Sequence, residues 1–197
     1  MRAQQRIIAV SEATARDLTS LLGVRADKLS VIYEAADALY QPVADPQAIQ
    51  PTLAKYGLSP PFILFVGTIE PRKNLSTLLR AFHHLRSRYK ASLQLAVVGK
   101  RGWLSDDVFA LLDELKLHED VKLLGPLPAH ELAALYNGAR CLALPSLYEG
   151  FGLTALEAIS CGTPVVVSNT SSLPEVVGDA GLCLSPHSSQ TTICIAN

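Results

Sequence analysis

The chain alternates between short, continuous apolar runs and longer segments in which apolar residues recur every three or four positions. Each run is apolar at consecutive positions rather than at alternate ones, so both faces of the corresponding strand would be buried. Such strands are typical of a parallel sheet that is covered by helices on both sides. The pattern predicts five strands, at residues 62–66, 93–98, 121–124, 141–144 and 165–167.

The segments between these runs have the periodicity of helices. Leucine and phenylalanine recur at helical spacing over residues 75–85, and Asn74 is placed to cap the first turn. A shorter helix is expected near Ser172, where Pro174 suits the first turn. Three further segments share the helical pattern, at residues 105–115, 132–136 and 153–160. Before them, residues 7–10 resemble one strand of a preceding sheet, followed by a helix at residues 12–22.

This regular alternation predicts an α/β fold with a Rossmann-like, doubly wound parallel sheet. Strands and helices in this order form right-handed crossovers, which place helices on both faces of one open sheet. Ligands of such sheets bind at the carboxyl ends of the strands. We therefore expect functional groups directly after Val66, Val98, Leu124, Leu144 and Val167.

Composition limits the partners of the chain. The 197 residues suit one domain, and 49% hydrophobic with 18% charged residues is ordinary for a globular protein. The net charge of -1 gives no general attraction to nucleic acid or to an anionic membrane. Any anion site must therefore come from a local arrangement of residues.

Cysteine usage and the first residues bear on the compartment. The four cysteines contain no C-x-x-C pair, which favours reduced thiols over a disulfide framework or a zinc site. Residues 1–6 are too few and too polar for a signal peptide, and no apolar stretch approaches the length of a membrane span. We expect a soluble, cytoplasmic chain.

Two adjacent cations, Arg72 and Lys73, lie between the first strand of the predicted sheet and the helix that follows it. Unpaired backbone N–H groups and the helix dipole favour an anion at this position. The pair is a candidate for diphosphate binding, and the alternative is a solvated pair of loop charges. A lone Gly67, and no G-x-G-x-x-G motif, follows the strand, which disfavours a dinucleotide-binding oxidoreductase.

The second candidate site is the segment 145–157, which contains two glutamates and two glycines around Phe151. Glycine on either side of Phe151 permits close approach of a ligand and φ angles that other residues avoid. Glu149 lies in the loop and Glu157 one turn inside the helix, where they would suit sugar hydroxyls rather than a phosphate. The alternative is that Glu149 caps the helix and Glu157 is solvated.

Several motifs, in order, resemble family 4 (group 1) glycosyltransferases. The string 149–153 together with Glu157 resembles the E-x7-E signature of that family. Residues 67–74 are similar to its strand-to-helix loop in the branch that includes mannosyltransferases, and residues 162–180 resemble its next strand and helix. The resemblance covers about residues 7–184, and the ordered set is far more specific than any single motif.

The resemblance implies the GT-B type of fold, in which two Rossmann-like lobes face each other, and this chain supplies the C-terminal, donor-binding lobe. The domain division it implies is a remnant of the N-terminal lobe and interlobe segment (1–36), a connecting segment (37–61), a nucleotide-sugar-binding Rossmann-like domain (62–184) and an irregular tail (185–197). The chain would then be truncated at both ends. The missing lobe would bind the acceptor, which would be a sugar, glycan or lipid-linked molecule. It would also make any peripheral contact with a membrane.

The resemblance also implies roles for residues, with Glu149, Arg72 and Lys73 as the catalytic set. Arg72 and Lys73 would neutralise the diphosphate of a nucleotide-sugar, GDP-mannose or a UDP-hexose, with no metal ion or other cofactor. Glu149 would hold sugar hydroxyls and Glu157 the ribose, and transfer would retain the anomeric configuration. Thr154 stands where the family often has proline. The expected donor contacts also include Gly67, Gly125, Leu127, Phe151, Gly152, Leu153 and Thr154.

Two alternatives to a complete transferase stay open. The chain could be a non-catalytic module that binds a nucleotide-sugar, or a truncated partner of a separate acceptor lobe. A relative of the same architecture, such as an epimerase or a phosphorylase, is the other, because a fold does not fix chemistry.

Overall fold

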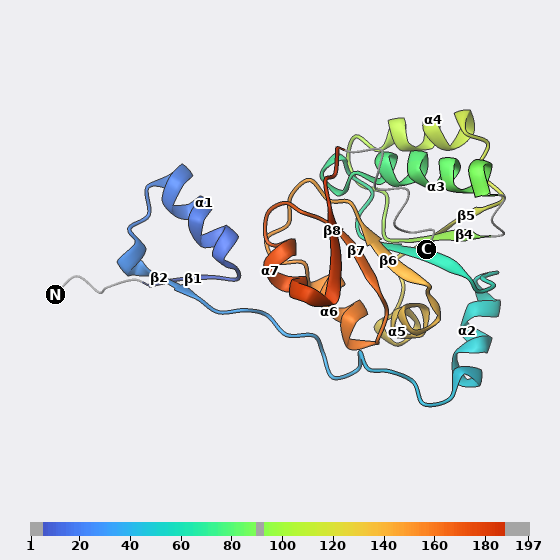
Figure 1. Ribbon diagram of the computed structural model, residues 1–197, viewed down its shortest axis with the longest axis horizontal. Coiled ribbons are helices and arrows are strands. Elements are labelled where there is room, and N and C mark those ends of the chain that lie inside the picture. The colour runs from blue at the N-terminus through green and yellow to red at the C-terminus, as the bar shows by residue number, and fades with distance from the viewer. Residues whose placement is uncertain (1–5, 90–92, 188–197) are drawn as a thin grey trace.

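The computed structural model describes residues 6–89 and 93–187, and its main body is a six-stranded sheet in which all neighbouring strands are parallel (Figure 1). The strand order is β5-β4-β3-β6-β7-β8. All five predicted strands are present, and β8 adds a sixth at the edge. The bounds are β3 Phe62–Val66, β4 Gln94–Val98, β5 Val121–Gly125, β6 Cys141–Leu144, β7 Val165–Ser168 and β8 Gly181–Leu184.

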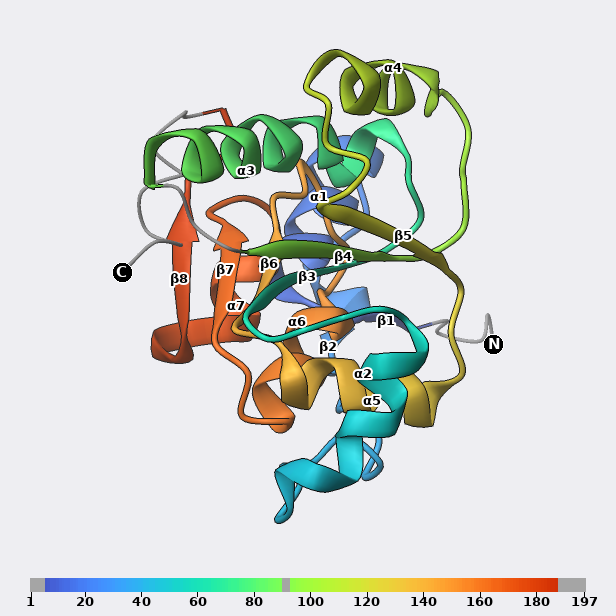
Figure 2. The ribbon, with the colours of Figure 1, turned by 90° about the vertical axis from the view of Figure 1, so that its right-hand side faces the viewer.

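Helices cover both faces of this sheet, as the α/β prediction requires (Figure 2). One face carries α3 (Leu75–Tyr89) and α4 (Asp106–Glu114). The other face carries α2 (Gln50–Lys55), α5 (Ala129–Gly138), α6 (Leu153–Ser160) and α7 (Leu173–Val177). The five helices predicted from residue 75 onward are confirmed, within a few residues at their ends.

The central strand β3 shows why its sequence is a continuous apolar run. Ile63 and Phe65 point into the core beneath α3 and α4, whereas Phe62 and Leu64 point into the core beneath α2 and α5. All four side chains are fully buried. Because successive side chains of a strand alternate between faces, burial on both sides requires an apolar residue at every position.

A smaller unit precedes the main body. Strands β1 (Ile7–Ala9) and β2 (Leu29–Val31) form a separate parallel pair, joined by helix α1 (Glu12–Leu22). The predicted strand and helix at this end of the chain are therefore confirmed, and β2 is an addition. Ser11 caps α1 by accepting a hydrogen bond from the N–H of Thr14, and the left-handed Gly23 ends the helix.

The segment between the two units lies along the main body (Figure 1). The ring of Tyr40 contacts that of Tyr136 edge to face, at 5.7 Å between centroids. The N–H of Val43 donates to the side chain of Asn137 at 2.8 Å. Leu53 of α2 is buried in the same core as α5, so α2 is packed as part of the main body.

Short 3₁₀ turns complete the described elements, at Ala26–Lys28, Pro46–Ile49, Pro71–Lys73 and Gly178–Ala180. Within residues 6–89 and 93–187, no helix is both long enough and apolar enough to cross a membrane. The irregular tail expected at 185–197 lies mostly outside the described residues.

Candidate functional site

The candidate site lies at the carboxyl ends of β3 and β6, where the winding of the sheet reverses. From β3 the chain passes through α3 to β4 on one side, and from β6 it passes through α6 to β7 on the other. The crossovers diverge at this point, and open α/β sheets bind ligands beside the loops that follow such strands. These loops are residues 67–74 and 145–152.

The structure brings the predicted catalytic residues of the two loops into direct contact. The Nζ of Lys73 lies 2.6 Å from Oε1 of Glu149, and Nη1 of Arg72 lies 3.0 Å from Oε2 of the same carboxylate. A second carboxylate, Glu70, pairs with Nη2 of Arg72 at 2.7 Å. Three residues singled out from separate parts of the sequence therefore form one ionic cluster.

The two cations differ in how far their side chains are buried. The side chain of Lys73 is 11% exposed and that of Glu149 is 9% exposed, whereas that of Arg72 is 41% exposed. A solvated pair of loop charges, the alternative considered for Arg72 and Lys73, therefore does not describe Lys73. Glu149 pairs with these cations, which also differs from the alternative in which it caps a helix.

The surroundings of Glu149 favour its charged form. Burial raises the pKa of this carboxyl, but Lys73, a hydrogen bond from Ser146 and Arg72 together outweigh burial, so the net shift is downward. The hydroxyl of Ser146, which is fully buried, donates to Oε1 at 2.7 Å. Burial lowers the pKa of Arg72, yet Glu149 and Glu70 raise it overall. Glu149 and Arg72 thus each favour the charged form of the other.

Two residues of the first loop hold Lys73 in this position. A Cβ added at Gly67 would lie 3.3 Å from Cε of Lys73, so the lysine stem runs directly over the glycine. Asn74, which has a left-handed φ of 55°, donates from Nδ2 to the carbonyl of Pro145 at 3.0 Å. It thereby ties the first loop to the second, and its Oδ1 accepts a hydrogen bond from the hydroxyl of Thr77 at 2.7 Å.

The two glycines around Phe151 differ, which corrects the expectation for one of them. Gly152 has a φ of 111°, and a Cβ there would lie 2.7 Å from Cδ2 of Leu173. At Gly150 the backbone is not left-handed and an added Cβ would meet open space. Because Gly152 immediately precedes α6, the helix starts at Leu153 without a side-chain cap from that position.

The N-terminal end of α6 is accordingly suited to an anion. The first N–H groups of any helix lack a carbonyl partner within the helix, and at this end they belong to Leu153 and Thr154. Leu153 is 38% exposed. The predicted donor contacts at Gly152, Leu153 and Thr154 therefore lie together at the start of α6, where Gly152 is buried, Thr154 is half-buried and Leu153 is exposed.

Serines after β7 fix the backbone of the second loop. The hydroxyl of Ser172 donates to the carbonyls of Glu149 at 2.9 Å and of Phe151 at 2.6 Å. The N–H of Glu149 donates to Oγ of Ser171 at 2.9 Å. The sequence reasoning did not select these serines or Ser146. The signal available was the hydroxyl-rich segment 168–172 at the carboxyl end of a predicted strand.

Glu157 occupies a different environment, one turn inside α6. It is half-buried and accepts a hydrogen bond from the hydroxyl of Tyr136 at 2.8 Å, so it is not simply solvated. Burial raises the pKa of Glu157, and hydrogen bonds from Tyr136 and Tyr40 only partly offset that effect. The structure therefore places this carboxyl among phenols rather than among cations.

The remaining predicted positions follow β5. Gly125 ends that strand with a left-handed φ of 69°, and its carbonyl accepts from the N–H of Gly99 at 2.9 Å. Leu127 is partly buried against the core that contains α5. Both residues lie at the carboxyl edge of the sheet, where β4 and β3 separate β5 from β6.

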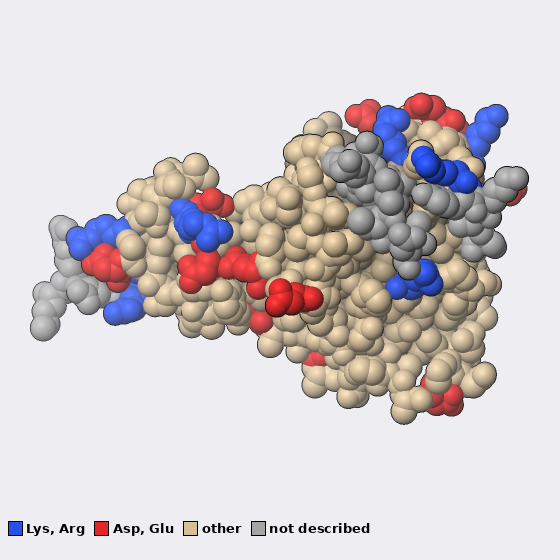
Figure 3. Space-filling model, viewed as in Figure 1, with Lys and Arg blue, Asp and Glu red and all other residues tan. Residues whose placement is uncertain are grey.

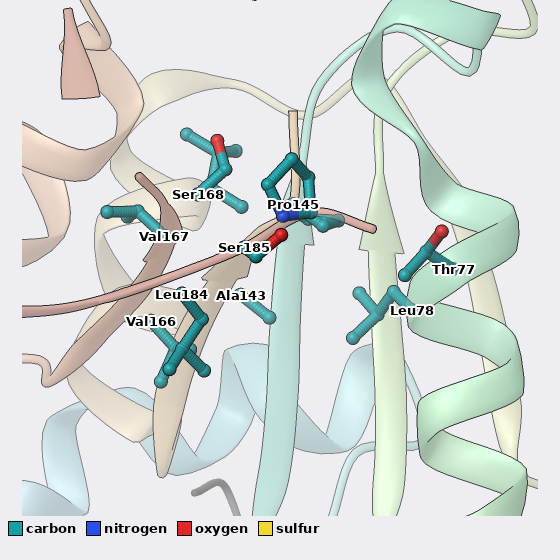
Figure 4. A pocket seen from close by; sticks show the side chains of 11 residues that line it. Thr77, Leu78, Ala143, Pro145, Val166, Val167, Ser168, Leu184 and Ser185 are labelled. Carbon is teal, nitrogen blue, oxygen red and sulfur yellow. The ribbon is translucent and has the colours of Figure 1, made fainter. Parts of the chain in front are cut away.

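A small apolar cavity lies close to this edge, between α3 and the last strands (Figure 4). It has room for about 10 Å³ of solvent, which is roughly one water molecule. Figure 4 shows Leu78, Ala143, Val166 and Leu184 around it, with Pro145 and Ser168 at its upper side. The cavity is too small and too apolar to hold a diphosphate.

The charges and thiols elsewhere in the described residues form no metal cluster. On the face drawn in Figure 3, charged side chains of both signs lie on the small first unit and near α3 and α4, and acidic side chains form a row where the first unit meets the main body. No cluster of three or more metal-ligating side chains occurs among the described residues. Cys141 and Cys161 are buried free thiols, and burial raises the pKa of each to about 11; Cys194 lies outside the described residues.

Known proteins are similar to this chain in sequence and in fold. Residues 52–193 match the family described as Glycosyl transferases group 1. O-antigen chain mannosyltransferase B of Escherichia coli is 40% identical over 182 residues, which are 92% of this chain and 48% of that protein. A D-inositol 3-phosphate glycosyltransferase of Nocardia farcinica is 34% identical over 191 residues, covering 92% of this chain and 42% of that protein.

Solved structures of other proteins also superpose on this chain. The HepE protein of Anabaena, in complex with UDP and glucose, superposes with a TM-score of 0.84 at 25% identity, over 97% of this chain and 52% of that one. A glycosyltransferase of Rickettsia africae superposes with a TM-score of 0.86 at 21% identity, over 98% and 52% of the two chains. The chain thus spans about half of these structures and less than half of the curated relatives. The predicted fold, one Rossmann-like lobe of a two-lobed glycosyltransferase, is confirmed, and the chain belongs to the group 1 glycosyl transferases.

Proposed function

We propose that this chain forms the donor-binding half of a glycosyltransferase that transfers a hexose from a nucleotide-sugar with retention of configuration. The observation that carries the proposal is the contact of Lys73 and Arg72 with Glu149 at the switch point of the sheet. Mannosyltransferases among the relatives and the UDP and glucose held by HepE support a sugar nucleotide as donor.

The diphosphate of the donor would bind between the two cations and the end of α6. Charge-assisted hydrogen bonds to phosphate are worth on the order of 1.5–3 kcal/mol each, so two cations and a helix end are enough to hold it. Glu149 already positions Lys73 before a donor arrives. Such preorganisation lowers the cost of ordering the lysine on binding. Arg72, which is more exposed, would exchange part of its contacts with Glu149 and Glu70 for contacts with the phosphates.

The sugar would lie beside Glu149 and the backbone of Phe151 and Gly152. A carboxylate accepts hydrogen bonds from hydroxyl groups, and the low pKa of Glu149 keeps it an acceptor near neutral pH. The ribose would reach Glu157, whose other partner is Tyr136. Gly125 and Leu127 would border the base at the neighbouring edge of the sheet.

The chemical step depends on charge that develops on the leaving diphosphate. Arg72 and Lys73 would stabilise that charge in the transition state more strongly than in the ground state, which lowers the barrier. We propose that these cations take the part of a metal ion. The acceptor would be bound by the other lobe, so transfer is proposed for the complete protein and donor binding for this chain.

Calorimetric titration of the 197-residue chain with GDP-mannose, UDP-glucose, GDP, UDP and NAD tests the proposal. We expect one of the two sugar nucleotides to bind, and the matching nucleoside diphosphate to bind more weakly. Binding of NAD alone, or of no nucleotide, would overturn it. Binding without hydrolysis or transfer, even when the acceptor lobe of a relative is supplied, would favour a non-catalytic module.

A further inference from the structure

The first turn of α1 reaches across to the loop that carries Glu149. The hydroxyls of Ser11 and Thr14 both donate to the carbonyl of Gly150, at 2.6 Å and 2.9 Å. More than 130 residues separate these partners in the sequence. The peptide group they hold joins Gly150 to Phe151, one residue beyond Glu149, so a shift of that carbonyl would move the loop and with it the carboxylate relative to Lys73.

Glu175 of α7 holds α1 in place from the other side. Its two carboxylate oxygens accept hydrogen bonds from the N–H groups of Glu12 and Ala13, each at 3.0 Å. A carboxylate at this position also interacts favourably with the positive end of the helix dipole. Ser11 accepts from the N–H of Thr14 at 3.0 Å, so three donors of the first turn are satisfied. The helix is thereby fixed to the main body by its N-terminal end.

The loop residues on either side of Glu149 also contact this first unit. The hydroxyl of Tyr148 donates to Asp17 at 2.7 Å, and the ring of Phe151 lies 6.0 Å from that of Tyr33. Glu149, which lies between them in the sequence, contacts Lys73. The loop therefore contacts both the small unit and the ionic cluster.

Gly150 explains why such a support is needed. It has no side chain, and a Cβ there would meet open space. Packing of its own side chain therefore cannot fix the orientation of its peptide group. The serines after β7 hold the carbonyls of Glu149 and Phe151 but not that of Gly150. Ser11 and Thr14 supply the hydrogen bonds that are missing from that set.

We infer that the first turn of α1 is a positioning clamp for the donor site, in which Ser11 and Thr14 hold the Gly150 carbonyl and Glu175 holds the helix. The clamp sets the distance from Glu149 to the sugar, and it does not touch the groups that bind the diphosphate. This inference rests on the proposed function, because its readout lies at the sugar end of the donor.

Two variants test the clamp without removing the helix cap. Thr14→Val keeps the shape of the side chain and removes one donor to Gly150, while Ser11 still caps α1. Glu175→Gln keeps one acceptor oxygen and removes the charge. The matched controls are Thr19→Val, whose hydroxyl bonds to Ala15 within α1, and Asp179→Asn, an exposed acid four residues after Glu175.

Calorimetry on the full chain gives the main readout. We expect Thr14→Val and Glu175→Gln to weaken binding of the sugar nucleotide about fivefold to tenfold and to change binding of the bare nucleoside diphosphate less than about twofold. The controls should bind both ligands as the wild type does. Unchanged affinity for the sugar nucleotide, or an equal loss for both ligands, would overturn the inference.

Hydrogen exchange separates this inference from the proposed function. If the wild type binds no sugar nucleotide, the proposed function fails, and the clamp is then judged by exchange of the amides of residues 149–152 in the free chain. We expect faster exchange there in Thr14→Val and Glu175→Gln than in the wild type and the two controls. Equal exchange rates in all five proteins would show that α1 does not hold the loop.

Discussion

At the scale of residues, the pair of Lys73 and Glu149 is the most strongly buried ionic contact of the site. Lys73→Met removes the nearer cation and leaves a buried carboxylate with Arg72 alone. We expect this to reduce the free energy of unfolding by about 3 kcal/mol, the lower end for a broken buried pair, because Arg72 remains. Urea unfolding followed by circular dichroism measures the change.

The double variant Lys73→Met, Glu149→Gln is the control for that loss. With both charges removed, no unpaired ion is buried, so most of the lost stability should return. If the double variant is as unstable as the sum of the two single variants, the pair has no coupling energy and the contact contributes nothing specific to the site.

The lowered pKa of Glu149 predicts a pH dependence. A carboxyl whose pKa is lower in the folded state than its ordinary value of 4.5 contributes stability that is fully present above that value. The contribution is lost as the pH falls through the lower, folded-state pKa. The difference in unfolding free energy between the wild type and Glu149→Gln should therefore shrink below about pH 4.5. A difference that stays constant from pH 7 to pH 3 would contradict the assignment.

Donor binding should respond differently to the two members of the pair. Lys73→Ala should weaken sugar nucleotide and bare nucleoside diphosphate alike, by roughly tenfold to a hundredfold for one charge-assisted contact. Glu149→Gln should weaken the sugar nucleotide more than the bare diphosphate, since the charge beside the sugar is lost while the amide oxygen of the new side chain can still accept from Lys73. Calorimetric titration distinguishes the two patterns. Equal losses for both ligands in Glu149→Gln would contradict a role for this carboxylate at the sugar.

Sequence singles out a site residue where its type is rare for the position and overlooks it where the type is common. Two adjacent cations at a strand end and a glutamate among glycines attract notice, and these are the residues that meet in the cluster. Ser146, Ser171 and Ser172 are ordinary loop residues by sequence. Only the path of the chain shows that their hydroxyls hold Glu149 and its backbone.

At the scale of elements, the start of α6 depends on one glycine of the two that precede it. Gly152→Ala would place a methyl group 2.7 Å from Leu173 on a residue with a φ of 111°. We expect a loss of about 2–3 kcal/mol in the free energy of unfolding and weaker donor binding, since the helix end must move. Thermal unfolding and calorimetry measure both effects.

Gly150→Ala is the matched control, because a Cβ there meets open space and the backbone is not left-handed. It should leave stability within about 0.5 kcal/mol of the wild type. Similar losses in both variants would mean that flexibility of the whole loop, rather than the geometry at Gly152, sets the start of α6.

The elements that the sequence predicted are those whose burial is complete. Strands β3 and β6 are apolar at successive positions because both faces are covered, and their bounds were predicted as the structure has them. Strands β2 and β8 were not predicted. Both are partly exposed, at the edge of a sheet or in a two-stranded pair, so no continuous apolar run marks them.

At the scale of the whole molecule, the chain consists of a main body and a small first unit. The two meet at the loop of residues 145–152 and at α7 (Figure 1). The two large hydrophobic clusters of the main body contain no residue before Tyr40. The first unit instead exposes apolar side chains, among them Ile8 at 63%, Leu21 at 77% and Leu22 at 73%. Its contribution is therefore to the site more than to the core.

A chain shortened to residues 37–197 should accordingly remain folded. It keeps both clusters and the contacts of Tyr40 with Tyr136, and it loses only the hydrogen bonds and ring contact to the first unit. We expect a cooperative thermal transition within about 5 °C of the full chain, because 1 kcal/mol moves the midpoint by about 2–4 °C at this size. It should bind the nucleoside diphosphate normally and the sugar nucleotide more weakly, since the clamp is gone.

A chain shortened further, to residues 62–197, is the control that shows where the body begins. It lacks Ile49, Leu53 and Leu58, all buried in the core with α5, and losing large buried side chains costs about 2–5 kcal/mol each. We expect no cooperative transition from this shorter chain, although its sheet and donor loops are complete. If it unfolds as cooperatively as 37–197, then α2 is a connector only. If 37–197 itself is unfolded, the first unit is part of the core after all, and its contacts with the donor loop cannot be separated from folding.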